Sequence, residues 1–172
     1  MFILIKILKK IFTILHSNAT PTQIGWGVVL GSFLGLAPFF SLHKLFIFLL
    51  ILLLNVNMGA AFLSVLIFSF AGILTDPLAH QIGYSMLVDA NALTGFWTNL
   101  YNMPIVPFTR FYNTIVMGSF VIALIAALPV FFSVKKFVVY YREHWANKVE
   151  NWKIIKYFKL TKIFKIYSTY RG

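Results

Sequence analysis

A long apolar run, residues 24–74, constrains this chain more than any other feature of its sequence. Lys44 is its only fully charged residue. One membrane-spanning helix needs about twenty apolar residues, and a helix on the surface of a soluble domain carries a polar face that this run lacks. The run therefore predicts several helices surrounded by lipid.

The composition of the whole chain agrees with a membrane protein. Hydrophobic residues make up 60% of the sequence and charged residues 11%, whereas soluble domains carry about 25% charged residues. The 15 Lys and Arg residues outnumber the 4 Asp and Glu residues, which gives a formal net charge of +11. In a membrane protein this excess serves contact with anionic lipid and orientation in the bilayer. Cysteine is absent, which excludes disulfides, thiolate metal sites and a cysteine nucleophile.

Residues 1–18 predict an amphipathic helix that lies in the membrane surface. Its lysines interrupt the apolar residues instead of preceding them, and no small-residue cleavage site follows, so we do not expect a cleaved signal peptide. On a helix, Lys6, Lys9 and Lys10 fall on one side and apolar residues on another. A solvated helix packed on the rest of the domain is the alternative.

Residues 19–134 are expected to form the membrane domain. Its apolar segments cover residues 23–37, 42–54, 58–74 and 111–134, and an external loop covers residues 75–110. Thr20 suits the N-cap of the first helix, and Pro21 suits its first position. Pro38 removes a backbone donor and disfavours helix at the residue before it. The first two segments are therefore predicted to be separate helices that form a hairpin.

Three glycines in the first segment recur every four residues, at Gly27, Gly31 and Gly35. This spacing places them on one face of a helix, where a second helix can approach closely. We interpret them as a helix-packing face.

The third segment is expected to end at Asp76-Pro77, and the mixed sequence after it predicts a short amphipathic helix around residues 78–88. The segment at residues 111–134 predicts the clearest single crossing, with Pro129 as a place for a kink. The fold class is therefore an all-α integral membrane protein. It combines short broken helices with transmembrane helices and has amphipathic interfacial helices at both ends.

The distribution of lysine predicts the orientation. Both ends of the chain are basic, whereas residues 75–109 contain acids and no lysine. The positive-inside rule places both termini in the cytoplasm, so the number of full crossings must be even. Two arrangements satisfy this condition: a re-entrant hairpin at residues 23–54 with two full spans, or four crossings of which two are short.

Residues 135–172 are predicted to form a basic cytoplasmic tail. Lysine recurs there at every third residue, as Lys153, Lys156, Lys159, Lys162 and Lys165. On an α-helix, steps of three turn back by about 60° each, so these lysines do not form one clean stripe. We expect the tail to contact anionic headgroups at the membrane surface. A partner protein is the alternative, and nucleic acid is not expected.

Residues with catalytic potential are sparse. No HExxH, phosphate-binding loop, GxSxG or pair of carboxylates at helical spacing is present, so no catalytic residue, metal or cofactor is expected. The best constellation gathers around the expected helix break: Pro38, Ser41, His43 and Lys44, joined by Asp76 and His80 if the external helix ends meet. An unpaired lysine in hydrocarbon costs several kcal/mol, so we predict a lipid- or ion-binding site there. The alternative is that Lys44 extends to the headgroup region.

Small residues and prolines form a recognisable pattern in residues 20–88: Pro21, Thr22, Gly25, Gly31, Gly35, Pro38, Asn57, Pro77 and Gly83. In this pattern the chain resembles a bacterial membrane family known as a domain of unknown function, DUF2062. The chain departs from the pattern after Pro38, where a glycine is expected, and at Asp76-Pro77, where Asn-Pro is expected. These departures indicate a divergent member.

The resemblance also implies a setting for the protein. Some members are attached to glycosyltransferase domains, and some are encoded beside large envelope proteins that resemble the bridge-like lipid-transfer family. The resemblance therefore implies that this chain acts in the inner membrane as a partner of a protein that moves lipid toward the outer membrane.

Three classes of function fit these features. The favoured one is a small, non-catalytic subunit of the inner membrane that anchors or supports an envelope lipid-transfer machine. Its expected partners are anionic lipids, a larger envelope protein and further copies of the chain. The second is a small transporter or channel for an anionic lipid or ion, with Lys44 at the Pro38 break as counter-charge. A lipid-modifying enzyme is the least favoured class.

Overall fold

The computed structural model describes residues 2–38 and 40–146, and the predicted all-helical architecture is confirmed for this part of the chain. Six α-helices follow one another there: α1 (Phe2–Leu15), α2 (Pro21–Leu36), α3 (Leu42–Leu53), α4 (Met58–Tyr84), α5 (Thr94–Tyr101) and α6 (Thr114–His144). A π-helical turn η1 (Ser85–Asp89) and two 3-10 turns, η2 (Asn91–Leu93) and η3 (Val106–Thr109), lie between α4 and α6. The tail lysines from Lys153 to Lys165 lie outside the described residues, and so do the side chains of residues 2–6.

Helix α2 begins where the sequence indicates. Thr20 is its N-cap, and Pro21 is its first residue. The Thr20 hydroxyl accepts from the Gln23 amide at 3.2 Å, while the Gln23 side chain accepts from the Thr20 amide at 2.8 Å. This reciprocal pair is a capping box, which satisfies two backbone donors at the start of the helix.

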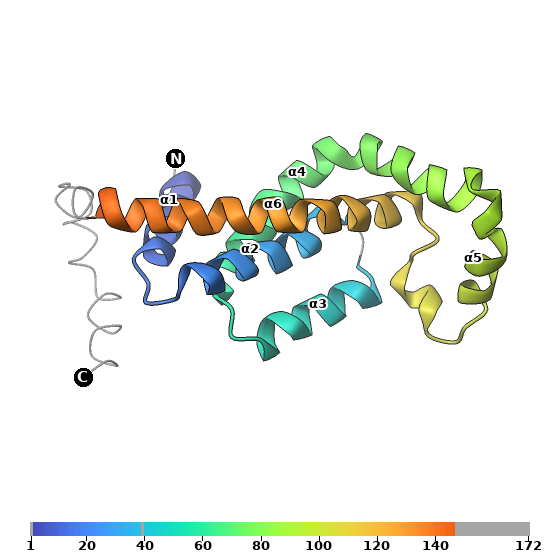
Figure 1. Ribbon diagram of the computed structural model, residues 1–172, viewed down its shortest axis with the longest axis horizontal. Coiled ribbons are helices and arrows are strands. Elements are labelled where there is room, and N and C mark those ends of the chain that lie inside the picture. Colours follow the sequence, from blue (N-terminus) through green and yellow to red (C-terminus); the bar gives the residue numbers. More distant parts are fainter. Residues whose placement is uncertain (1, 39, 147–172) are drawn as a thin grey trace.

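Helices α2 and α3 form the predicted hairpin, with the break at Pro38. Ala37 and Ser41 have extended backbone angles, so the chain leaves α2 and enters α3 without helical continuity. Helix α3 then returns antiparallel to α2 (Figure 1). The Asn57 amide donates to the Gln23 carbonyl at 3.1 Å, so the chain comes back to the start of α2 before α4 begins.

The centre of the molecule is the contact between α2 and α4. A Cβ at Gly27 would lie 2.6 Å from the Asn57 carbonyl oxygen, one at Gly31 would overlap the Ala61 carbonyl, and one at Gly35 would lie 2.7 Å from the Val65 carbonyl oxygen. All three glycines of the predicted packing face thus lie against successive turns of α4. Two helices approach this closely only where side chains are absent.

Glycines also allow close packing between α4 and α6, near the end of α4 and the start of α6. A Cβ at Gly83 would overlap the Thr114 carbonyl, and one at Gly118 would overlap the Ala79 carbonyl. Helix α6 also packs on α2, where Trp26 and Phe131 lie with ring centroids 4.8 Å apart. The three helices α2, α4 and α6 therefore form one bundle held by small residues.

The prediction that the third apolar helix ends at Asp76-Pro77 is wrong. Helix α4 contains Pro77 and continues to Tyr84, so no separate helix begins at residue 78. The continuation buries Ala79 and Gly83 against the start of α6, and this packing offsets the one backbone hydrogen bond that an internal proline removes. Figure 1 shows α4 as a curved helix, as expected for one that contains proline.

Helix α6 extends farther than the predicted crossing at residues 111–134. It begins after Asn113, whose side chain accepts from the Ile115 and Val116 amides, and it contains Pro129. Its last turns include Lys135 and Lys136, so the first part of the predicted tail belongs to this helix.

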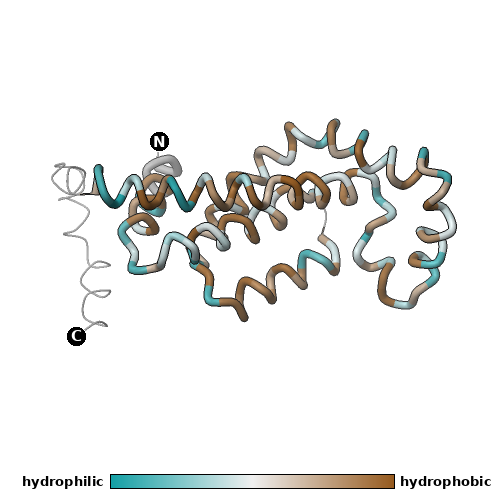
Figure 2. Tube along the Cα trace, viewed as in Figure 1, coloured by the Kyte–Doolittle hydropathy of each residue, from teal (hydrophilic) through white to brown (hydrophobic). Residues whose placement is uncertain are grey.

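Large apolar side chains point outward on three helices. Leu53 on α3 is 80% exposed, Leu74 on α4 is 82% exposed, and Ile125 on α6 is 69% exposed. Figure 2 shows the corresponding apolar stretches on α3 and the middle of α6, with polar residues at both ends of α3 and at the last turns of α6. Within the described residues, α4 with η1 and α6 are the two helices long and apolar enough to cross a membrane.

Candidate functional site

The predicted site at the helix break is partly assembled. Ser41 is 3% exposed, and its hydroxyl lies 2.9 Å from His43 Nδ1. The same nitrogen lies 3.0 Å from the Thr109 carbonyl oxygen, which joins α3 to η3. A carbonyl oxygen only accepts hydrogen bonds, so Nδ1 carries a proton, and Nε2 is the acceptor of the neutral ring.

Lys44 has a structural partner. Its ammonium group donates to the carbonyl of Ala37, the residue that follows the last turn of α2. A cation at a helix C-terminus satisfies an unpaired carbonyl and suits the helix dipole. Within the described residues, no acidic side chain forms an ion pair with Lys44. Lys44 thus ties the first turn of α3 to the end of α2.

The other predicted members of this site lie in different contacts. His80 Nδ1 is 2.7 Å from the Thr114 hydroxyl, so His80 joins α4 to the start of α6. In the part of the chain that the structure describes, no hydrogen bond or ion pair connects Asp76 or His80 to Ser41, His43 or Lys44. The structure therefore brings Ser41 and His43 together, with Thr109 as a partner that the sequence did not indicate.

A small apolar cavity lies beside His43. Its volume is about 270 Å³, and its walls come from α3, α5, η3 and α6. Trp97, Phe111 and Phe120 contribute aromatic rings to the lining, which is otherwise mainly aliphatic. The Trp97 indole donates to the Met86 carbonyl at 2.8 Å, which fixes α5 against η1.

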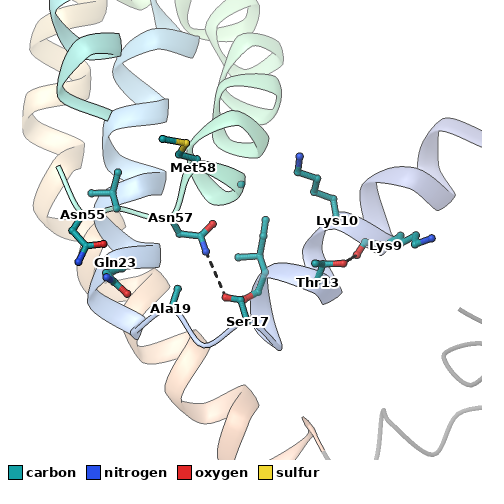
Figure 3. Close-up of a pocket in the computed structure, with 12 residues that line it drawn as sticks. Lys9, Lys10, Thr13, Ser17, Ala19, Gln23, Asn55, Asn57 and Met58 are labelled. Atoms are coloured by element: carbon teal, nitrogen blue, oxygen red, sulfur yellow. Dashed lines mark hydrogen bonds between the residues drawn. The ribbon is translucent and has the colours of Figure 1, made fainter. Parts of the chain in front are cut away.

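A larger and more polar hollow lies at the opposite end of the molecule, between α1 and the start of α4 (Figure 3). We call it the α1–α4 hollow. Its volume is about 710 Å³, and its lining consists of Lys9, Lys10, Thr13, Ile14, Ser17, Ala19, Gln23, Asn55, Val56, Asn57, Met58 and Gly59. Lys9 and Lys10 were predicted to bind the membrane surface, whereas the amides were not predicted to form a site. The sequence signal that could have indicated this hollow is the group of polar residues between the apolar segments, such as Ser17, Asn55 and Asn57.

Helix α1 is held against this hollow by its C-terminal half. Ile14 and Leu15 are buried in a cluster with Ile24, Val138 and Tyr141. The Asn57 side chain caps α4 by accepting from the Ala60 amide at 2.8 Å, and its nitrogen lies 3.5 Å from the Ser17 hydroxyl. The hollow is therefore framed by elements that are fixed to the bundle.

The described residues contain no cluster of side chains that could bind a metal ion. No group of three or more His, Asp or Glu side chains lies close enough there to hold a metal ion.

Comparison with known proteins places the chain among bacterial proteins. The family model described as "Uncharacterized protein conserved in bacteria (DUF2062)" matches residues 6–146, a wider range than the pattern at residues 20–88. An uncharacterized protein of Treponema pallidum (strain Nichols) is 28% identical over 148 residues, which cover 86% of this chain and 91% of that protein. No solved structure matches the chain.

Proposed function

We propose that this chain, which belongs to the DUF2062 family of proteins conserved in bacteria, is a non-catalytic inner-membrane subunit that supports a larger envelope machine for lipid transfer. The observation that carries the membrane part of the proposal is the large number of apolar side chains that are exposed on α3, α4 and α6. Leu53, Leu74 and Ile125 face outward, while glycine, alanine and serine lie between the helices. A soluble protein places its large apolar side chains in the core.

Helix lengths support two full crossings. The 27 residues of α4 and the 31 residues of α6 correspond to about 40 Å and about 46 Å of helix, longer than the hydrocarbon layer of about 30 Å. Helices α2 and α3, with 16 and 12 residues, correspond to about 24 Å and about 18 Å. We therefore favour the arrangement with α2 and α3 as a re-entrant hairpin beside two spans.

The charges support an orientation with both termini in the cytoplasm. Lys9, Lys10 and Arg142 lie at the end of the molecule that holds α1 and the last turn of α6 (Figure 1). Asp89 lies near the other end, in the connection between α4 and α5. Lysine and arginine favour the cytoplasmic side of a membrane.

A supporting role suits the chemistry of the helix break better than catalysis does. Ser41 and His43 are spaced like a nucleophile and a base, but Ser41 is buried and its hydroxyl lies nearest to Nδ1, at 2.9 Å, and this nitrogen carries the proton that faces the Thr109 carbonyl. Nε2, which holds the free lone pair, lies farther from the hydroxyl, at 3.5 Å. A base must have a free lone pair toward the nucleophile. The choice of a lipid-transfer machine rests on the family resemblance, because some members of that family are encoded beside large envelope proteins.

Transport through the helix break is the alternative function. It requires Lys44 to face a bound anion or a pathway. The hydrogen bond from Lys44 to the Ala37 carbonyl gives this lysine a structural role instead, so we rank transport second.

Purification of the tagged full chain from its native membrane, after cross-linking and with native lipids retained, tests the proposal. We expect one large envelope protein to co-purify in a fixed ratio, and we expect deletion of the chain to slow the delivery of lipid to the outer membrane. Ion flux through liposomes that contain only this chain would instead support transport, and headgroup turnover would support an enzyme. Either result, without a stoichiometric partner, would refute the supporting role.

A further inference from the structure

We infer that the α1–α4 hollow binds the phosphate headgroup of an anionic glycerophospholipid. The inference rests on one part of the proposed function, which is that the chain is embedded in a membrane. The hollow measures about 710 Å³, within the range of about 300–1,000 Å³ that ligand pockets occupy. A headgroup with its glycerol therefore fits, whereas a single ion would leave most of the hollow filled with water.

The charge of the lining selects an anion. Lys9 and Lys10 contribute two positive charges, and the lining contains no Asp or Glu. In Figure 3 the Lys10 side chain extends from α1 into the space beside α4, while Lys9 points away from that space. Lys10 is exposed, so its ammonium group is accessible to a ligand. Ammonium groups form short, charge-assisted hydrogen bonds with phosphate oxygens.

Neutral polar groups complete the lining. Gln23 and Asn55 also line the hollow, on the side away from the two lysines (Figure 3). The Gln23 oxygen accepts from the Thr20 amide, so the amide nitrogen of Gln23 can donate to a ligand, whereas the Asn55 amide can both donate and accept. These groups suit the hydroxyl and ester oxygens of a glycerol headgroup. Ile14 lies close to Gly59, where an added Cβ would be 3.4 Å from Ile14 Cγ1. An apolar contact between α1 and α4 therefore forms part of the lining.

An apolar ridge on α4 leads away from the hollow and favours a lipid over free phosphate. Met58 lines the hollow, and Phe62 and Leu66 follow it at intervals of four residues. The three side chains are 45%, 48% and 42% exposed. Side chains four residues apart form a continuous ridge along a helix. An acyl chain attached to a headgroup in the hollow can lie along this ridge.

The test measures lipid binding by the full chain in a neutral detergent. The probes are phosphatidylglycerol and phosphatidylcholine with the same acyl chains, and native mass spectrometry measures how much of each lipid the protein retains. The double variant Lys9→Gln/Lys10→Gln is compared with Lys135→Gln/Lys136→Gln, which removes the same charge from an exposed part of α6. We expect the first variant to weaken phosphatidylglycerol binding about tenfold and the second to change it less than about twofold. Asn55→Asp, which adds a negative charge to the lining, is expected to weaken binding as well.

Three results would overturn the inference. Equal losses in the two double variants would show general attraction to charge, and equal binding of the two lipids would show no selection for an anionic headgroup. Glycerol phosphate that binds as tightly as phosphatidylglycerol would identify a soluble phosphate as the ligand. The test is independent of any partner protein, so lipid binding without a co-purified partner would refute the supporting role alone.

Discussion

The Arg142 guanidinium joins the end of α6 to the end of α1, because its Nε donates to the Leu15 carbonyl at 3.0 Å. One terminal nitrogen of the same side chain donates to the Ser17 and Ala19 carbonyls, each at 2.9 Å. One side chain thus satisfies the carbonyl of Leu15, the last residue of α1, and two carbonyls of the connection between α1 and α2. Arg142 thereby fixes the position of α1, which forms one wall of the α1–α4 hollow.

Replacement of Arg142 should release α1 from the bundle. We expect Arg142→Ala to lower the free energy of unfolding by about 2 kcal/mol, since hydrogen bonds to charged groups contribute about 1.5–3 kcal/mol. Arg142→Lys should recover only part of the loss, because an ammonium group cannot match the planar donors of a guanidinium. Unfolding by titration with sodium dodecyl sulfate measures the difference.

The release of α1 can be measured separately with a thiol. The chain has no cysteine, and Leu15 is 6% exposed, so a cysteine at Leu15 should react slowly with a maleimide. We expect Arg142→Ala to speed this reaction, whereas Lys136→Ala on the exposed side of α6 should not. Equal reaction rates in the two backgrounds would show that Arg142 does not hold α1.

The close contact between α2 and α4 predicts a strong effect of a single methyl group. A Cβ at Gly31 would overlap the Ala61 carbonyl and lie 2.7 Å from Ser64 Cβ, so Gly31→Ala must push the helices apart. Overpacking of this kind costs about 1–3 kcal/mol. Gly95→Ala is the matched control, because a Cβ at Gly95 meets nothing within 4 Å. A thermal scan in detergent should show a lower midpoint for Gly31→Ala alone, and similar midpoints would contradict the packing.

Local features of this fold were predictable from the sequence, while distant contacts were not. The Thr20 cap and the break at Pro38 depend on neighbouring residues, so their chemistry can be read directly from the chain. The passage of α4 through Pro77 was mispredicted because the packing of Gly83 on Thr114, which lies beyond the proline, joins residues that are distant in the sequence. Arg142 and Leu15 are 127 positions apart, and no local pattern links them.

The same distinction applies to the candidate sites. Ser41 and His43 are two positions apart and were predicted to act together, but the Thr109 carbonyl that orients the imidazole is 66 positions from His43. The α1–α4 hollow draws on α1, α2 and the start of α4. Its lysines were identified by their charge, whereas its amides acquire a role only once the helices are assembled.

A hydrogen bond between α2 and α4 should contribute measurably to stability. The Ser64 hydroxyl donates to the Val28 carbonyl at 2.6 Å, and Ser64 is 2% exposed. We expect Ser64→Ala to cost about 0.6 kcal/mol, the average for interhelical hydrogen bonds in a membrane protein, and no more than about 1.7 kcal/mol, the largest value. Ser69→Ala is the control, because the exposed Ser69 hydroxyl donates to the Val65 carbonyl of its own helix. Equal unfolding free energies of the two variants would argue against a stabilising interhelical bond.

The contact between His43 and Thr109 should restrain α3. We expect His43→Ala to accelerate amide hydrogen exchange in α3, because the helix loses its hydrogen bond to η3. His43→Asn should retain slow exchange, since the asparagine amide can donate from a position close to that of Nδ1. Exchange followed by mass spectrometry in detergent distinguishes the variants, and unchanged exchange in His43→Ala would show that this contact does not restrain α3.

Single cysteines should distinguish a re-entrant hairpin from two additional crossings. In the absence of native cysteine, Asn18→Cys, Phe40→Cys and Asn99→Cys place one thiol each between α1 and α2, at the helix break and in α5. With an impermeant maleimide, we expect Asn18→Cys to react only from the cytoplasmic side and Asn99→Cys only from the opposite side, because α4 separates the two ends.

Phe40 is 78% exposed, so a thiol there should react readily in detergent. In the intact membrane it should stay unreactive from both sides, because α2 is too short to carry it across. Reaction of Phe40→Cys from the same side as Asn99→Cys would instead show that α2 crosses the bilayer.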